Sequence, residues 1–144
     1  MMNITKLFDH KKTLFSLEIF PPKKDSPYNT IYNTLLRLRG IPADFISVTY
    51  GAGGSSRERT GEIASAVQNR WGLTSLAHLT CMGSSPSEIE GVMEKLEQEG
   101  VSNILALRGD PRPGEERADS PFSYAADLIR FHLPPGATRM DLCV

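Results

Sequence analysis

One carboxylate, Glu18, stands near the end of an apolar, strand-like run that Pro21 and Pro22 stop. Residues alternate along this run, so Glu18 shares a face with Leu14 and Phe20 and is expected to point into a packed layer. Apolar surroundings disfavour the charged form of a carboxylate, and such a group can act as a general acid near neutral pH. The alternative is a strand-end glutamate that reaches water, because structural carboxylates outnumber catalytic ones.

Polar side chains also end three further predicted strands. These strands cover residues 44–50, 74–81 and 101–108, and their polar residues are Thr49, His78 and the Arg108/Asp110 pair. A lone histidine on a strand is more often a hydrogen-bonded core residue than a ligand contact. Asp110 either pairs locally with Arg108 or, with Gly109, offers backbone amides to an anionic or polar cofactor. Because the carboxyl ends of parallel strands face the ligand in α/β folds, we expect these groups to converge on one rim.

A glycine-rich turn at residues 51–56, with the sequence GAGGSS, follows the second predicted strand. The turn lacks the third glycine of the G-x-G-x-x-G fingerprint, which argues against a Rossmann dinucleotide fold. Its glycines permit a ligand to approach the backbone closely, although a plain sharp turn is an equal alternative. The three histidines lack metal-ligand spacing, so no metal site is predicted.

Apolar residues at helical spacing separate the predicted strands. The predicted helices cover residues 28–38, 57–71, 85–99 and 123–131. The third begins most clearly, because Ser85 can cap it, Pro86 suits its first turn and Glu88 completes a capping box. Strands and helices alternate with a period of about 30 residues, the length of one βαβ step. The predicted class is therefore α/β, with parallel strands joined by right-handed crossovers.

Composition is that of a soluble globular chain. With 144 residues, of which 40% are hydrophobic and 23% charged, one domain is expected. The formal net charge of -1 suggests neither nucleic acid nor an anionic membrane surface as a partner. No apolar run approaches the roughly 20 residues of a membrane span, and the polar start lacks the core of a secretory signal, so we expect a cytoplasmic protein. Cys81 and Cys143 are interpreted as free thiols.

Four motifs together are specific: LEIFPPK at residues 17–23, VTYGAGGS at 48–55, HLTC at 78–81 and LRGDP at 107–111. Over about residues 6–129 the chain resembles the methylenetetrahydrofolate reductase family. The resemblance implies a TIM-type (β/α)8 barrel that binds FAD and takes electrons from NADH or NADPH. It also implies reduction of 5,10-methylenetetrahydrofolate to 5-methyltetrahydrofolate in one-carbon and methionine metabolism, by a full-length form that is a homo-oligomer.

The resemblance also assigns roles to residues. Glu18 matches the family's general acid, which assists opening of the methylene bridge of the folate. The positions that match flavin-lining residues are Thr49, Tyr50, Ala52, His78, Arg108, Gly109 and Asp110. Thr49 also matches a nicotinamide contact, and Asp110 matches a carboxylate that meets the pterin. Tyr124 and Ala125 resemble a Tyr-Ala pair that supports the cofactor after the fourth strand.

The chain departs from the family at its end. A complete barrel takes about 250 residues, whereas this chain carries about four predicted βα units. Residues 1–131 are interpreted as the N-terminal half of the barrel, and residues 132–144 as a divergent tail. Half a barrel leaves two open sheet edges and an uncovered apolar face. Two hypotheses follow: a reductase sequence whose activity needs the other half, or an inactive remnant or half-barrel subunit that needs a partner chain.

Overall fold

A computed structural model describes residues 3–22, 27, 29–50, 57–110, 120–132 and 141–143. Its helices are α1 (Ile4–His10), α2 (Asn29–Leu38), α3 (Arg57–Asn69), α4 (Pro86–Gln98) and α5 (Ala125–His132). Its strands are β1 (Ser16–Ile19), β2 (Phe45–Val48), β3 (Ser75–Thr80), β4 (Asn103–Leu107) and β5 (Asp141–Cys143). The glycine-rich turn with Ala52 lies outside the described residues, as does most of the loop before α5.

The five strands form one parallel sheet in the order β1-β2-β3-β4-β5. Each of the first four strands is followed by a helix, so the predicted α/β class with parallel strands is confirmed. Strand β5 was not expected from the sequence, and it pairs with β4 through Ile104 and Leu142. The chain therefore runs four βα units and the start of a fifth strand, as in part of a barrel.

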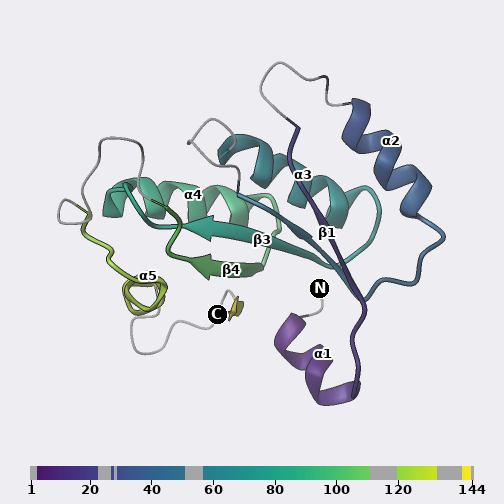
Figure 1. The fold of residues 1–144 in the computed structure, drawn as a ribbon, viewed down its shortest axis with the longest axis horizontal. Coiled ribbons are helices and arrows are strands. Elements are labelled where there is room, and N and C mark those ends of the chain that lie inside the picture. Colours follow the sequence, from purple (N-terminus) through teal and green to yellow (C-terminus); the bar gives the residue numbers. More distant parts are fainter. Residues whose placement is uncertain are drawn as a thin grey trace.

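One face of the sheet carries the main core. Helices α3 and α4 run along this face, and β1 crosses in front of the other strands in Figure 1 because the sheet is strongly twisted. Strand residues of this face that are fully buried are Ile46, Val48, Ala77, Leu79 and Ile104. From the helices, Ile63, Val67, Ile89 and Leu128 pack against them. Each such aliphatic side chain contributes about 1.5–3 kcal/mol of transfer free energy, so the helices are fixed by this layer.

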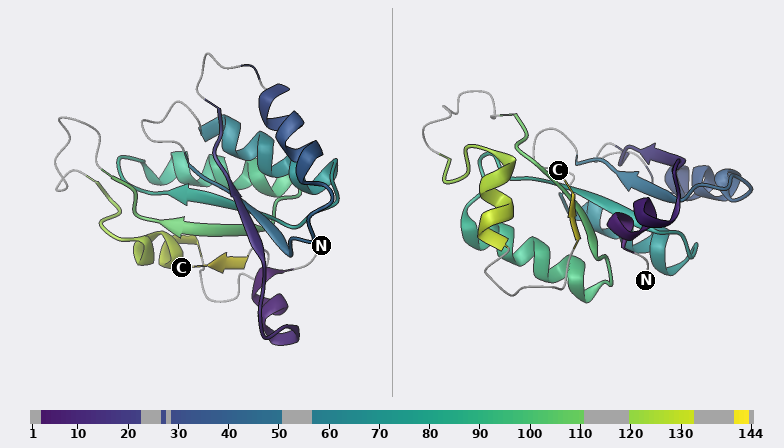
Figure 2. Two further views of the ribbon diagram at one scale, coloured as in Figure 1. Left: turned by 45° about the vertical axis from the view of Figure 1, so that its right-hand side comes forward. Right: turned by 90° about the horizontal axis from the view of Figure 1, so that it is seen from below.

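The opposite face is covered at its amino end by α1, a helix that the sequence pattern did not predict. Figures 1 and 2 show α1 apart from the other helices. Its Ile4 and Leu7 form a small second cluster with Leu76, against which Phe45 and Leu105 pack. No helix in the described ranges combines the length and apolar character that crossing a membrane requires.

Side-chain hydrogen bonds fix the starts of two helices. At α4, Ser85 accepts from the amide of Glu88 while the Glu88 carboxylate accepts from the amide of Ser85, so the predicted capping box is confirmed. At α1, the oxygen of Asn103 accepts from the amide of Ile4 at 3.0 Å. The same side chain donates to the Ser75 carbonyl at 3.2 Å and has no exposed surface. Asn103 therefore ties α1 to the sheet by supplying the cap from a distant strand.

Candidate active site

The polar residues singled out in the sequence lie at one end of the sheet. Glu18 is in β1, Thr49 follows β2, His78 is in β3 and Arg108 follows β4. Since these four strands are neighbours and parallel, their carboxyl ends form one rim. The four residues thus lie towards the same end of the sheet, whereas their convergence on one shared site stays a prediction. In parallel α/β folds this is the end at which ligands bind.

Glu18 lies between two polar partners from the neighbouring strands. Its Oε2 atom accepts a hydrogen bond from Ser47 Oγ at 3.2 Å. The same oxygen lies 3.7 Å from Nε2 of His78. Register explains the first contact, because Glu18 is paired directly with Ser47 across β1 and β2. The three side chains form a cluster, called here the Ser47–Glu18–His78 cluster.

The expectation that Glu18 is packed among apolar side chains is wrong. The Glu18 side chain is 49% exposed, and Phe20 on the same face is 69% exposed. Helix α1 covers this face only near the amino ends of the strands, where Leu76 and Phe45 lie. At the level of Glu18, the described residues supply no apolar layer above the carboxylate. Polar neighbours, not burial, define its surroundings here.

His78 carries a buried nitrogen without a partner. Its side chain is 10% exposed, and Nε2 makes no hydrogen bond within the described residues. Burial lowers the pKa of His78 below its ordinary value, and the negative charge of Glu18 opposes this only in part. A neutral imidazole can use Nε2 as either donor or acceptor, depending on the tautomer. Nε2 of His78 therefore differs from the ring nitrogens of a usual core histidine on a strand, which are hydrogen-bonded.

The end of β4 approaches β3 very closely. Gly109 has a positive φ of 78°, and a Cβ atom placed on it would lie 2.8 Å from Cβ of Thr80. Only glycine fits this position without strain, because Thr80 occupies the space that a side chain would need. Next to it, a guanidinium nitrogen of Arg108 lies 4.0 Å from a carboxylate oxygen of Asp110. Asp110 is 97% exposed, so this ion pair contributes little and leaves the carboxylate open to other partners.

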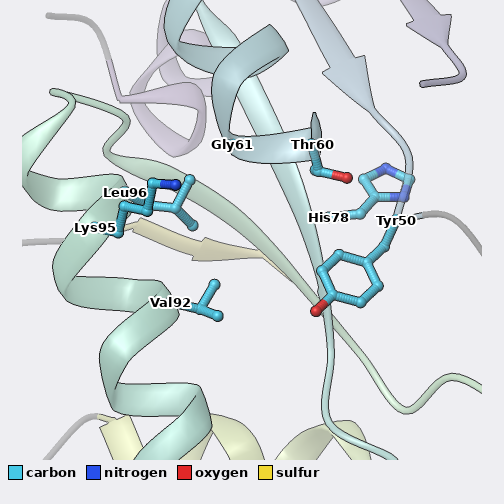
Figure 3. Close-up of a pocket in the computed structure, with 7 residues that line it drawn as sticks. All are labelled: Tyr50, Thr60, Gly61, His78, Val92, Lys95 and Leu96. Carbon is cyan, nitrogen blue, oxygen red and sulfur yellow. The ribbon is translucent and has the colours of Figure 1, made fainter. Parts of the chain in front are cut away.

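Tyr50 packs against the main core on the helix-covered face. Together with His78 of the cluster and residues of α3 and α4, it lines a cavity of about 60 Å³. Figure 3 shows Val92 and Leu96 of α4 on one side of this cavity and Tyr50 on the other. Ligand pockets usually measure about 300–1,000 Å³, so this cavity is too small for a flavin or a folate.

The Tyr124–Ala125 pair lies where α5 begins. Tyr124 is 67% exposed, and its amide donates to the carboxylate of Asp127 at 2.9 Å. The Tyr124 carbonyl lies 3.7 Å from the thiol of Cys81, which follows β3. Burial raises the pKa of the Cys81 thiol, so this cysteine is a packing residue that connects α5 to the rim. In the described chain Cys81 is a free thiol, and no group of three potential metal ligands occurs there.

Ser47 belongs to the cluster but was not among the sequence candidates. It is only 7% exposed, in a strand whose other residues are mostly apolar. Its hydroxyl meets Glu18 because β1 and β2 pair in one particular register, and register depends on contacts that sequence spacing does not contain. A polar residue at an inward position of a short apolar strand was the one available signal.

Parallel strands in sequential order, with the helices that follow them packed on one face, fit a partial (β/α) barrel. Comparison with known proteins gives the family. A model of the family described as methylenetetrahydrofolate reductase matches residues 3–136. The chain belongs to this family, which confirms the resemblance seen in the motifs.

Curated relatives carry the same name. The chain is 38% identical over 114 residues to 5,10-methylenetetrahydrofolate reductase of Escherichia coli, a match that covers 79% of this chain and 38% of the relative. It is 35% identical over 129 residues to methylenetetrahydrofolate reductase (NADH) 1 of Arabidopsis thaliana, covering 88% and 22%. For methylenetetrahydrofolate reductase 1 of Schizosaccharomyces pombe the identity is 38% over 125 residues, covering 84% and 21%. The chain thus spans about a fifth to two fifths of the length of these relatives.

Proposed function

We propose that this chain supplies the first part of an FAD-dependent barrel that reduces 5,10-methylenetetrahydrofolate to 5-methyltetrahydrofolate with NADH or NADPH. The observation that carries the proposal is the Ser47–Glu18–His78 cluster at the carboxyl ends of the strands, in a chain of this family. A carboxyl group at this end can meet a substrate from the open side of the sheet.

The residues present fit a flavin. A buried polar atom without a partner, such as Nε2 of His78, normally finds one in a ligand or in water. Beside Gly109, Arg108 and Asp110 offer charged groups, and Asp110 is exposed. The residues that would hold FAD are Thr49, Tyr50, Ala52, His78, Arg108, Gly109, Asp110, Tyr124 and Ala125. When bound, FAD supplies hydride transfer between the nicotinamide and the folate.

Glu18 is proposed as the general acid. The proton on its carboxyl group passes to a nitrogen of the methylene bridge, and the bond from that nitrogen to the bridging carbon breaks. The electron pair of this bond stays on that nitrogen, while the lone pair of the other nitrogen of the bridge forms a C=N bond to the bridging carbon. The iminium so formed can accept hydride. Proton transfer by a positioned side chain contributes about 10²–10⁴-fold to rate. Asp110, which is exposed at the same rim, is proposed to contact the pterin.

A second candidate is a half-barrel subunit that lacks activity alone. It is favoured by the short span of the chain relative to its relatives and by the exposed side chains of Phe15 and Phe20, which flank β1. A pocket for a cofactor buries most of the ligand, and the described strands supply one side of it. We therefore propose that the 144 residues by themselves bind FAD weakly and do not turn over the folate.

A chimera tests the proposed function. Residues 3–136 replace the matching segment of the Escherichia coli relative, and reduction of methylenetetrahydrofolate is measured. The chimera is expected to reduce the folate. In it, Glu18→Gln should lower this rate by on the order of 10²-fold or more, with flavin content and reduction by nicotinamide retained.

Glu90→Gln is the matched control, because it removes the same charge at an exposed position of α4. Unchanged folate reduction in the Glu18→Gln chimera would refute the role of Glu18. For the chain alone, size-exclusion chromatography with detection at flavin wavelengths is the test. A monodisperse monomer with stoichiometric flavin would refute the proposal that these residues are insufficient.

A further inference from the structure

Ser47, on the neighbouring strand β2, is the hydrogen-bond partner of the Glu18 carboxyl group. Its hydroxyl oxygen lies 3.2 Å from Oε2 of Glu18 and 3.4 Å from the carbonyl oxygen of Leu17. Both distances are compatible with hydrogen bonds, although the hydroxyl has a single hydrogen to donate. The two contacts are therefore alternatives at any moment. Which of them forms depends on whether Glu18 carries a proton.

The two protonation states of Glu18 require opposite behaviour from a neighbour. An ionised carboxylate only accepts hydrogen bonds, so Ser47 must then donate its hydrogen to Oε2. A carboxyl group protonated on Oε2 becomes a donor, and Ser47 Oγ can then accept from it. In that state the hydroxyl hydrogen of Ser47 turns to the Leu17 carbonyl, which is already within reach. No heavy atom has to move between the two arrangements.

We propose that Ser47 is a positioning residue that keeps the Glu18 carboxyl group in one place in both of its protonation states. The inference rests on the proposed role of Glu18, since a general acid must cycle between these two states at one position. Ser47 is suited to it because it is 7% exposed and sits in the strand between those of Glu18 and His78. A methyl group in its place could make neither bond.

His78 provides a reporter for the position of the carboxylate. Its Nε2 lies 3.7 Å from the oxygen that Ser47 holds. Within the described residues, the charge that acts on His78 is that of Glu18, which raises the pKa of the imidazole against the larger effect of burial. If the carboxylate swings away from His78, the pKa of His78 must fall. The chain has only three histidines, so their resonances can be followed separately.

The test is a nuclear magnetic resonance titration of the three imidazoles in the 144-residue chain and its variants. Glu18→Gln is expected to lower the pKa of His78, because the charge is removed. Ser47→Ala should lower it towards the value in the Glu18→Gln variant, since the carboxylate is no longer held. Ser47→Thr retains a hydroxyl and should leave the pKa as in the unmodified chain. The resonances of the other two histidines serve as references in the same spectra.

A wild-type pKa of His78 in Ser47→Ala would overturn the inference, and so would a Glu18→Gln variant without effect. If Ser47→Ala fails to fold, Ser47→Cys takes its place, because a thiol has a similar volume to the hydroxyl and is a weak hydrogen-bond donor. The inference then requires Ser47→Cys to lower the pKa of His78. Couplings that report χ1 of Glu18 test both states: one rotamer is expected at acidic and alkaline pH, and averaging in Ser47→Ala. If χ1 of Glu18 were averaged over several rotamers in the unmodified chain at acidic pH, Ser47 would not hold the protonated carboxyl group, and that part of the inference would be overturned.

This experiment is independent of catalysis. If the Glu18→Gln chimera kept full folate reduction, the general-acid role would fail while the titration of His78 stayed as expected. If the titration failed and the chimera lost activity, Glu18 would remain the acid and Ser47 would lose its assigned role. The two failures are therefore distinguishable.

Discussion

The two faces of the sheet differ in what covers them. One face is packed under α3 and α4, and its residues Val48, Leu79 and Ile104 have no exposed surface. The other face is apolar only beneath α1, and towards the carboxyl ends it carries Ser47, Glu18 and His78. The difference shows that stability is supplied mainly from one side. The open side can then hold groups whose desolvation a packed core would penalise.

Truncation of one leucine on each face should have the largest effect and tests this difference directly. Leu79→Ala removes a fully buried side chain beneath the helices, so it should lower the free energy of unfolding by about 3–5 kcal/mol. Leu105 is only partly buried and packs against the cluster beneath α1, so Leu105→Ala should cost about half as much. Chemical denaturation measures both. Equal costs would contradict the assignment of stability to the helix-covered face.

Gly109 at the rim should be the next most sensitive position. Gly109→Ala places a Cβ 2.8 Å from Thr80 at a positive φ, so we expect a loss of about 2 kcal/mol or more. The matched control is Gly91→Ala in α4, where a Cβ meets nothing within 4 Å. That change should stabilise the chain by about 0.5–1 kcal/mol, because alanine favours the helix. A neutral Gly109→Ala variant in thermal denaturation would show that the β3–β4 rim can open.

Asn103 should show what the cap of α1 contributes to the open face. Asn103→Ala leaves the Ile4 amide and the Ser75 carbonyl without this partner, which should cost about 1–2 kcal/mol. Asn69→Ala is the control, since the exposed Asn69 also donates to a carbonyl but in contact with water. Its cost should be within about 0.5 kcal/mol. Similar losses in the two variants would mean that the buried cap does not anchor α1.

The smallest predicted effect is a pH dependence carried by His78. Burial lowers its pKa in the folded chain below the ordinary 6.5. Between the folded pKa and pH 6.5, the unfolded chain therefore binds more protons than the folded chain. Stability from this group is therefore complete above pH 6.5 and is lost as pH falls through 6.5 to the folded pKa. In His78→Gln, the denaturation midpoint should depend less on pH over this range. His10→Gln should leave the pH dependence of the midpoint unchanged. An unchanged slope in His78→Gln would contradict burial as the cause.

Local patterns predicted the helix-covered face well. The α4 start followed from Ser85, Pro86 and Glu88, which act within one turn, and the strand ends followed from alternation along each strand. The end of the sheet at which Glu18 and His78 meet was also predicted from the sequence, because parallel strands present their carboxyl ends together.

Features that depend on distant partners were missed. Helix α1 has little pattern of its own, and it is held by Leu76 and Asn103 from β3 and β4. The surroundings of Glu18 were wrong because alternation gives the face of a residue but not what covers that face. Ser47 was missed because its contact with Glu18 depends on strand register, which no local pattern specifies.

The hydrogen bond between Ile4 and Asn103 has a consequence for how the chain is made. Its two residues are 99 positions apart, and a ribosome adds about 5–20 residues per second. The segment of α1 therefore leaves the ribosome about 5–20 s before the residue that caps it. A seven-residue helix is not stable in water alone, so it waits unstructured, with Ile4 and Leu7 uncovered, for that time. The first helix of the sequence is thus among the last parts of the described fold to find its place during synthesis.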